Sequence, residues 1–344
     1  MKEWPRVSIV MPCNNEERFI GRAIESLIDD YFHGNCELMV VDGGSEDRTR
    51  EIVMDYVEGE KADELGIRGK VRMIDNPGRL QSKGLNLGIK EARGEIIVRA
   101  DAHCVFPAGY VRRCVELLET TGAANVGGVM QPVEWNNNSG QSAIVLALQH
   151  PVGVGDARWH LGKYSGYVDT VYLGTFRKKL FDEIGLFDQV AHTNEDAELN
   201  LRIVKSGGKI YLDSSLQVAY FPRESLGQLA RQYFNYGRGR CYTTLKHRRL
   251  TSWRQVAPVV LVVGLAGAAA VSFVWPWALL FPAAYLLTLT VVAMLSKGRA
   301  ERKEGRLLRF ARNDSLPVRL LMAAAFAVMH ISWGAGFISR FIKK

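Results

Sequence analysis

Cysteine is scarce in this chain. Five cysteines stand among 344 residues, and no two of them form a Cys-x-x-Cys pair. A secreted disulfide scaffold needs a higher cysteine density, and a structural zinc site needs paired ligands at short spacing. Residues 1–12 also lack an apolar segment long enough for a secretory signal. We therefore expect reduced, mostly packed cysteines in a part of the chain that stays in the cytoplasm.

The glycine motifs that cradle nucleotide phosphates are absent as well. No Gly-x-x-x-x-Gly-Lys-Ser/Thr occurs, and no Gly-x-Gly-x-x-Gly follows the first predicted strand. These absences exclude the usual P-loop and dinucleotide-binding sites. A ligand that carries phosphate would have to be bound by a metal ion and basic side chains.

Charged side chains are missing from forty consecutive residues, 256–295. The net charge of +8 lies entirely behind that segment, where 11 basic and 3 acidic residues follow it. A neutral front part and a basic tail behind an apolar segment indicate a membrane rather than nucleic acid. We therefore expect no nucleic-acid partner, a catalytic-sized domain at 1–250 and a membrane anchor at 251–344.

The apolar segment is long enough for two membrane crossings, because one crossing takes about 20 residues. Trp275-Pro276-Trp277 divides it, since proline ends a helix and tryptophan favours the membrane interface. The predicted spans are 256–274 and 278–295, with a buried core hairpin of a soluble protein as the alternative. A basic loop follows at 296–316, and the positive-inside rule places it in the cytoplasm.

A third apolar stretch, 320–338, has two interpretations. We predict that it spans the membrane too, which makes the protein multi-pass. A span would put Arg340, Lys343 and Lys344 on the outer side, against the charge bias. The alternative is a helix that lies on the membrane surface.

Short apolar stretches alternate with helical patterns in the front part of the chain. Strands are predicted at 7–11, 37–41, 71–74 and 95–99, with helices after the first three. Ser45 or Asp47 can cap the second of these helices. The alternation predicts an α/β domain with a mostly parallel sheet, in which ligands bind at the carboxyl ends of the strands.

Acidic and amide side chains follow the predicted strands at the point where each strand ends. They are Asn15, Glu16, Asp42 and Asp101. Each alone could be a helix cap, and for Asn15 capping is the simpler interpretation. Four such groups at successive strand ends indicate one ligand-binding crevice.

Asp101-Ala-His103 places two potential metal ligands two residues apart. A carboxylate and an imidazole suit Mn²⁺ or Mg²⁺ that is coordinated mainly by phosphate oxygens and water. Zinc bound through His103 and Cys104 is a weaker alternative, because adjacent residues rarely converge on one ion.

Thr193-Asn194-Glu195-Asp196 precedes a further helical pattern. Asn194 could cap that helix, with the two acids favouring its positive end. One of the two carboxylates could equally face the crevice and act as a general base.

Four motifs together resemble glycosyltransferase family 2, and the resemblance covers roughly residues 5–240. They are Val7-Ser-Ile-Val-Met-Pro-Cys-Asn-Asn-Glu-Glu17, Val40-Val-Asp42-Gly-Gly-Ser-Glu-Asp-Arg-Thr49, Arg99-Ala-Asp101-Ala-His103 and Asn194-Glu-Asp196. The segment from Leu173 to Asp188 is similar to the family's acceptor side. Within the family, Asp101-Ala-His103, His150-Pro-Val-Gly-Val-Gly155 and Val168-Asp-Thr170 are similar to the succinoglycan-biosynthesis glucosyltransferases. The resemblance implies the GT-A fold with a mostly parallel mixed sheet.

The resemblance also implies roles for individual residues. The nucleotide pocket would be lined by Pro12, Asn15 and Glu16, and Asp42 would bind the uracil ring. Asp101 matches the first acid of the Asp-x-Asp metal motif, and His103 stands where the second acid is usual. The catalytic base would be Asp196, with Glu195 as its neighbour.

The chain departs from the family at two places. Leu85 precedes Asn86 where many members have arginine, so Arg79 or Lys83 would contact the diphosphate instead. Processive synthases carry Gln-x-x-Arg-Trp near the membrane, whereas in this chain Arg238 is followed directly by Gly239 and not by tryptophan. The second departure favours transfer of a single sugar.

The expected protein is therefore an inverting, metal-dependent hexosyltransferase at the inner (cell) membrane, with its catalytic domain on the cytoplasmic face. Its donor would be a UDP-sugar, UDP-glucose above all, and its acceptor a hydroxyl of a lipid-linked saccharide in exopolysaccharide or cell-surface glycan synthesis. Membrane lipids would be further partners. The alternatives are a polyprenyl-phosphate sugar synthase and a non-catalytic, membrane-tethered sugar-nucleotide sensor.

Overall fold

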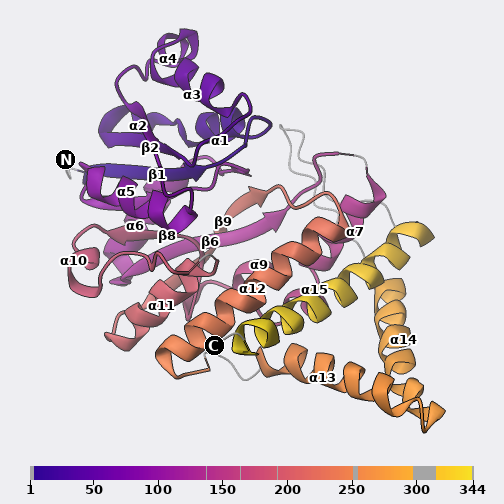
Figure 1. Ribbon diagram of the computed structural model, residues 1–344. Helices are drawn as coiled ribbons and strands as arrows, with labels where there is room; N and C mark the ends of the chain where they lie inside the picture. Colours follow the sequence, from indigo (N-terminus) through magenta and orange to yellow (C-terminus); the bar gives the residue numbers. More distant parts are fainter. Residues whose placement is uncertain are drawn as a thin grey trace. The chain divides into compact units, whose positions relative to one another are not determined.

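The computed structural model describes residues 4–136, 138–162, 164–191, 193–250, 255–296 and 315–342. They form two compact units (Figure 1). The first, called here the sheet unit, comprises Met1–Gln131 and Gly162–Tyr220. The second, the helical unit, comprises Pro132–Leu161 and Phe221–Lys344.

The sheet unit contains a nine-stranded sheet of order β3-β2-β1-β4-β8-β6-β9-β5, with β7 paired to β9. The strands are β1 Val7–Cys13, β2 Cys36–Asp42, β3 Val71–Asp75, β4 Ile96–Arg99, β5 Cys104–Val105, β6 Asn125–Pro132, β7 Gly166–Val168, β8 Tyr172–Arg177 and β9 Ile210–Tyr220. The four strands predicted from the sequence are β1 to β4.

The sheet is mixed, with a parallel half and an antiparallel half. β1 pairs in parallel with β2 and β4, and β2 pairs in parallel with β3. Every residue of β1 and β2 is buried, as expected for parallel strands with both faces covered. β8 pairs antiparallel with β4 and β6, and β9 pairs antiparallel with β5 and β7. The α/β prediction is confirmed, and the antiparallel half is an addition to it.

The sheet unit also contains helices. They are α1 Ile20–Leu27, α2 Asp30–Asn35, α3 Thr49–Val57, α4 Glu60–Glu64, α5 Gln81–Glu91, α6 Tyr110–Thr121, α10 Leu180–Ile184 and α11 Glu195–Lys205. α1 buries Ile20, Ala23, Ile24 and Leu27, which is one face at helical spacing. Ser45 does not cap α3, whereas Asp47 accepts a hydrogen bond from the backbone N–H of Thr49, the first residue of that helix.

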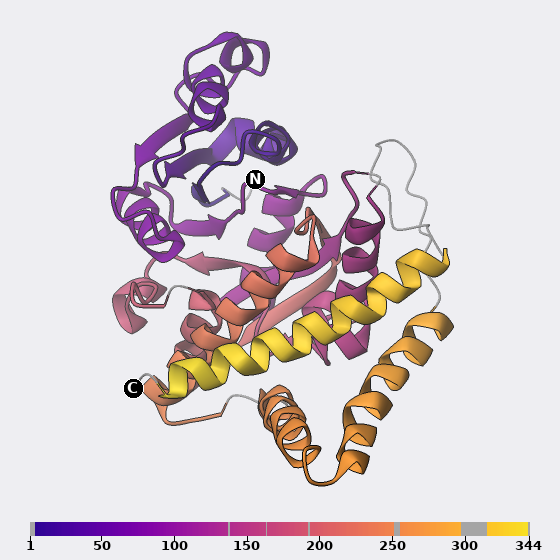
Figure 2. The ribbon, with the colours of Figure 1, turned by 45° about the vertical axis from the view of Figure 1, so that its right-hand side comes forward.

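The helical unit consists of α7 Ser139–Leu148, α8 Pro151–Val154, α9 Arg158–Leu161, α12 Leu226–His247, α13 Val256–Val271, the 3₁₀ turn η2 Pro276–Leu279, α14 Leu280–Leu295 and α15 Leu316–Ile342. Figure 2 shows α13 and α14 as the two arms of a hairpin, with α15 as a long single helix. The predicted break at Trp275-Pro276 is confirmed, because α13 ends at Val271 and η2 begins at Pro276.

Two helices in the described ranges are long and apolar enough to cross a membrane, Pro276–Leu295 and Leu316–Ile342, while Val256–Val271 is a shorter apolar helix. Length and composition of this kind are weak evidence for spanning, so the anchor at 251–344 stays a prediction. Residues 297–314 of the predicted basic loop, with Lys343 and Lys344, lie outside the described residues. By their contacts, α12 and the segment Pro132–Leu161 belong to the same unit as the apolar helices and not to the sheet unit.

Candidate active site

Asp42 ends β2 with its side chain completely buried. Its carboxylate accepts hydrogen bonds from the Ser45 hydroxyl at 2.5 Å and from the Arg50 guanidinium at 2.6 Å. Burial alone would raise the pKa of Asp42, but these bonds from Ser45 and Arg50 hold that pKa below its usual value. Asp42 is therefore an ionised hydrogen-bond acceptor at neutral pH.

The loop after β1 is tied to the loop after β2. Asn15 adopts a left-handed backbone conformation with φ 56°, and its N–H donates to the Ser45 hydroxyl at 2.9 Å. Its side-chain oxygen accepts from the backbone N–H of Glu46 at 2.8 Å. Pro12 lies within β1 and is buried opposite Val41 of β2. The structure thus brings Asn15 to the Asp42 loop, as expected for neighbouring strand ends.

Asp101 and His103 follow β4. The buried Asp101 carboxylate accepts from the Gln81 amide at 3.2 Å and lies 3.4 Å from the Arg99 Nε. His103 Nδ1 lies 3.0 Å from Glu16 Oε1, so the end of β1 is linked to the segment after β4. The predicted strand-end groups are therefore connected in pairs along β2, β1 and β4.

Glu195 and Asp196 form the first turn of α11. The buried Glu195 carboxylate lies 3.1 Å from the Arg99 guanidinium. Burial raises the pKa of Glu195 and the neighbouring Asp196 carboxylate adds to this, while Arg99 opposes it. Burial would lower the pKa of Arg99, but Asp101, Glu195 and Asp196 raise it above its ordinary value. One buried guanidinium therefore joins Asp101 to Glu195, the first of the two acids of α11.

The side chain of Asn194 does not cap α11, contrary to one of the two interpretations of the sequence. Asn194 occupies the N-cap position of α11 in a left-handed conformation with φ 60°, and its side chain makes no capping hydrogen bond. Asp196 Oδ1 instead accepts from the backbone N–H of Ala197 at 2.7 Å. The two acids still lie at the positive end of the helix.

The basic residues predicted for the diphosphate lie near the same loops. Arg79 is exposed, with φ 54°, and its Nε lies 3.4 Å from where a Cβ on Gly44 would stand. A Cβ on Gly78 would likewise meet the aliphatic part of the Lys83 side chain. Leu85 is buried in α5, and Asn86 holds the backbone of Phe187 through two hydrogen bonds. Arg79 is thus beside the Asp42 loop, while its role stays a prediction.

The donor set for a metal ion is small. Across the described ranges, no group of three or more His, Cys, Asp or Glu side chains converges on one point. Asp101 and His103 would therefore supply at most one carboxylate and one imidazole. Such a set fits Mn²⁺ or Mg²⁺ bound mainly through diphosphate oxygens and water, and it does not fit a structural zinc site.

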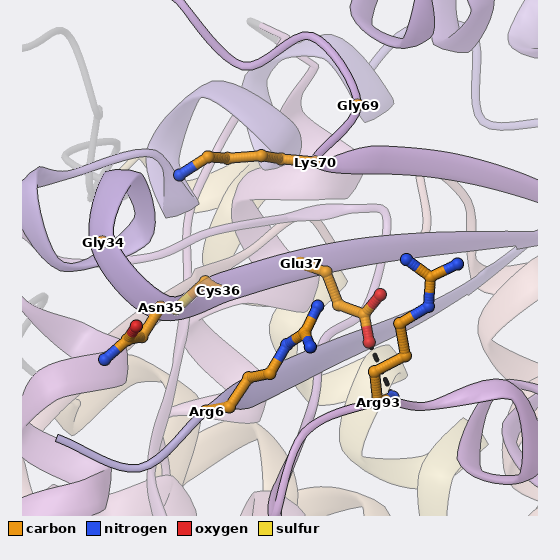
Figure 3. A pocket seen from close by; sticks show the side chains of 8 residues that line it. All are labelled: Arg6, Gly34, Asn35, Cys36, Glu37, Gly69, Lys70 and Arg93. Carbon is orange, nitrogen blue, oxygen red and sulfur yellow. Dashed lines mark hydrogen bonds between the residues drawn. The ribbon is translucent and has the colours of Figure 1, made fainter.

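A cavity of about 300 Å³ lies at the other ends of the strands (Figure 3). It is lined by Arg6, Gly34, Asn35, Cys36, Glu37, Gly69, Lys70 and Arg93, which include none of the predicted site residues. Lys70 donates to backbone carbonyls of α2, and Glu37 is bonded to Ser8 and Arg72. Ligands of parallel sheets bind at the carboxyl ends, so the chemistry is assigned to the strand-end groups and not to this cavity.

The sequence patterns single out neither Gln81 nor Arg99. Arg99 could have been found because it is the one charged residue of the apolar strand Ile96–Arg99, and a buried charge in a strand needs a partner. Nothing in the sequence signals Gln81.

Comparison with known proteins decides the family. The sequence model described as "Glycosyl transferase family 2" matches residues 8–185. The chain belongs to glycosyltransferase family 2. The succinoglycan biosynthesis protein ExoA of Rhizobium meliloti is 32% identical over 331 residues, which cover 96% of this chain and 93% of that protein. The chain is thus an ExoA-like member of the family, as its motifs predict.

A second relative and a solved structure support the same assignment. The dolichyl N-acetyl-alpha-D-glucosaminyl phosphate 3-beta-D-2,3-diacetamido-2,3-dideoxy-beta-D-glucuronosyltransferase of Methanococcus voltae is 26% identical, covering 67% of this chain and 71% of that protein. The mannosyltransferase PcManGT of Pyrobaculum calidifontis, solved with GDP-Man and Mn²⁺, superposes with a TM-score of 0.59 at 19% identity, covering 100% of this chain and 89% of that one. The fold is therefore that of the GT-A transferases, and the family member is a glycosyltransferase of glycan synthesis.

Proposed function

We propose that this family 2 enzyme transfers one sugar from a UDP-sugar, UDP-glucose above all, to a hydroxyl of a lipid-linked saccharide. The observation that carries the proposal is the buried Arg99, which contacts both Asp101 and Glu195 beside Asp196. This contact gathers the metal-motif acid and the acidic pair of α11 in one site. The relative named for succinoglycan biosynthesis supports an exopolysaccharide or cell-surface glycan as the product.

The reaction needs a base for the acceptor hydroxyl. Asp196 takes the proton as the acceptor oxygen attacks the anomeric carbon of the donor. A new carbon–oxygen bond forms, the bond from that carbon to the diphosphate breaks, and UDP leaves from the opposite face. The configuration at the anomeric carbon is therefore inverted. Glu195, fixed by Arg99, keeps the start of α11 in place.

The leaving diphosphate gains negative charge as the bond breaks. A bound Mn²⁺ or Mg²⁺ would neutralise part of that charge, and Asp101 and His103 are the residues that would hold it. Arg79 or Lys83 would supply a further positive charge to the diphosphate, in addition to that of the metal ion. The Mn²⁺ in the PcManGT structure supports a divalent ion without specifying which one.

The nucleoside end of the donor is assigned to the loops after β1 and β2. Asp42 is an ionised acceptor, which suits the N–H of a uracil ring. Pro12, Asn15 and Glu16 complete the pocket, because Asn15 is bonded to the same Ser45 that fixes Asp42.

The acceptor is assigned to the inner membrane because the helical unit carries exposed apolar helices. α13 has no buried residue, and α14 buries only Leu289 and Ala293 within the described structure. A helix that is apolar on every side and not covered by protein is typical of a lipid environment. The anchor keeps the cytoplasmic catalytic unit at the membrane that holds a lipid-linked acceptor, and basic segments can pair with anionic headgroups.

The test starts from membranes that contain the protein, Mn²⁺ and a panel of UDP- and GDP-sugars, with and without lipid extract. We expect release of UDP from one sugar, dependent on lipid extract and lost in Asp101→Ala and Asp196→Asn. A product in which the sugar is joined directly to polyprenyl phosphate would make the protein a polyprenyl-phosphate sugar synthase. Donor binding without release under every condition would make it a sensor and overturn the proposal.

A further inference from the structure

α15 is packed more closely along one side than along the other. In its most apolar window 39% of the residues are buried, against 11% for Pro276–Leu295. The residues exposed or half-exposed on α15 include an apolar stripe at helical spacing: Leu320, Ala324, Ala327, Val328, Ile331, Ala335, Ile338 and Ile342. The opposite stripe is buried at Val318, Met322, Ala325, Phe326, Met329 and Gly336. One face of this helix is therefore covered by protein. The exposed part of the other face is apolar, and it is interrupted by the buried Gly334, which lies against Pro258 of α13.

The C-terminal half of α15 packs closely against α12. A Cβ on Gly237 of α12 would collide with the Trp333 carbonyl, and one on Gly336 would collide with the Phe234 carbonyl. Further along, the Arg340 guanidinium lies 5.7 Å from the centre of the Tyr242 ring. The two helices therefore run side by side for more than one turn, as Figures 1 and 2 also show.

α12 cannot lie in the hydrocarbon core of a membrane. It exposes Arg231, Asn235, Arg238 and Lys246, and charged side chains are strongly disfavoured there. Because α15 is in backbone contact with α12, a crossing by α15 would carry these groups towards the bilayer centre.

The middle of α15 is held by polar bonds to other parts of the helical unit. His330 Nε2 lies 2.6 Å from the Val152 carbonyl oxygen of α8, and His330 Nδ1 lies 3.0 Å from the Tyr285 hydroxyl of α14. The His150 ring lies 5.3 Å from that of Phe326. The segment His150-Pro-Val-Gly-Val-Gly155 thus contacts α15 near the middle of the helix.

The start of α15 is fixed to the end of α14. Arg319 donates hydrogen bonds to the carbonyls of Ala293 and Ser296 at 3.0 and 2.8 Å. These carbonyls lie at the C-terminal end of α14. Because a guanidinium is disfavoured in the hydrocarbon core, we place this end of α14 at the membrane surface.

We infer that α15 lies along the cytoplasmic membrane surface, with its exposed apolar stripe against lipid, and does not cross the bilayer. The inference rests on the proposed membrane anchoring and replaces the predicted span at 320–338 by its alternative. The chain end then stays on the same side as the predicted basic loop, so Arg340, Lys343 and Lys344 obey the positive-inside rule. The crossing hairpin is formed by α13 and α14 alone.

Cysteine labelling in intact cells tests the topology. All five native cysteines are buried, so the background is low. Ser339→Cys and Phe341→Cys report on the end of α15, where Ser339 is half-buried, Phe341 is 58% exposed, and neither belongs to the apolar stripe. Val274→Cys reports on the hairpin tip, where the side chain is 90% exposed. A membrane-impermeant maleimide is applied before and after lysis.

We expect both chain-end variants to be labelled only after lysis, with at least a ten-fold difference, while Val274→Cys is labelled in intact cells. Labelling of either chain-end variant in intact cells overturns the inference, as does failure of both to react after lysis. Carbonate extraction of the same membranes separates the two proposals. A protein that is released by carbonate contradicts the anchor itself, whereas a retained protein leaves the labelling to decide α15.

Discussion

His103 Nδ1 lies 3.0 Å from Glu16 Oε1, across the ends of β4 and β1. A carboxylate in this place accepts the Nδ1–H and favours the imidazole tautomer whose lone pair is on Nε2. The T-shaped contact of the ring with Tyr220, at 5.3 Å between centroids, holds the plane of the imidazole. If His103 is the predicted metal ligand, Glu16 and Tyr220 fix the direction in which its Nε2 lone pair points.

Glu16→Gln should weaken metal binding by about 10- to 100-fold, because a carboxylate that orients a histidine ligand contributes about that much. The measurement is an EPR titration of Mn²⁺ in the presence of UDP, which needs no turnover. Glu17→Gln is the matched control, since it is the neighbouring residue and its carboxylate accepts from the Arg48 backbone. Equal Mn²⁺ affinity in wild type and Glu16→Gln would argue against His103 as a ligand.

Asp42→Asn should destabilise the protein by about 1–3 kcal/mol, because it removes the buried acceptor of Ser45 and Arg50. The folded pKa of Asp42 lies below its ordinary value of 3.8. Its contribution to the free energy of unfolding is therefore complete above pH 3.8 and is lost as the pH falls through the lower folded value.

Melting of the detergent-solubilised full chain across pH 3 to 7 checks this prediction. The difference in Tm between wild type and Asp42→Asn should shrink below the ordinary aspartate pKa of about 4. Asp75→Asn is the control, because Asp75 pairs with the same Arg50 but is 76% exposed at its side chain. A difference that stays constant with pH would mean that the Asp42 charge does not contribute.

The parallel half of the sheet could be predicted because its strands carry local signals. Residues 7–11 and 37–41 are apolar runs that end in polar groups, and the structure extends each to the full strand. The antiparallel half depends on pairings between distant segments, such as β8 with β4, which periodicity does not encode. The sequence predicts a span at 320–338, and the inferred surface position of α15 depends on its contacts with α8 and α12, which periodicity does not encode either.

The site was predictable where a residue follows a strand directly. Asp42 and Asp101 could be placed in this way at the ends of β2 and β4, and their roles in binding stay predictions. Gln81 and Arg99 act on Asp101 through space, so they became visible only in the folded chain. The pairing of Glu16 with His103 joins residues 87 apart in sequence and is of the same kind.

Gly237→Ala should destabilise the helical unit by about 1–3 kcal/mol, because its methyl group would collide with the backbone of α15 at Trp333. Gly227→Ala, on the same helix, is the matched control. Nothing lies within 4 Å of a Cβ at Gly227, so alanine should be neutral or stabilise by about 0.5–1 kcal/mol. Thermal unfolding in detergent measures both, and equal effects would contradict the close packing of α12 on α15.

Arg99→Met should lower kcat by about 100-fold, because the acids on β4 and α11 lose the group that joins them and a small misplacement costs about that much. UDP affinity, measured by calorimetry, should change far less, since Asp42 and Asn15 do not contact Arg99. Arg99→Lys keeps the positive charge and should recover part of the lost turnover. An effect confined to UDP affinity would contradict a positioning role.

Stability and positioning can be separated, because a second arginine in the same sheet is also paired with a buried acid. Arg72 lies 3.2 Å from Glu37 at the other end of the strands, away from the site. Arg72→Met should therefore lower the melting temperature, as Arg99→Met does, while turnover per folded molecule stays at the wild-type level. Arg99→Met with Glu195→Gln removes the Arg99–Glu195 pair but leaves the buried Asp101 without its guanidinium, so stability should return only in part while kcat stays low. Recovery of full turnover in that double variant would show that Arg99 only neutralises Glu195 and does not fix the position of Asp101 relative to α11.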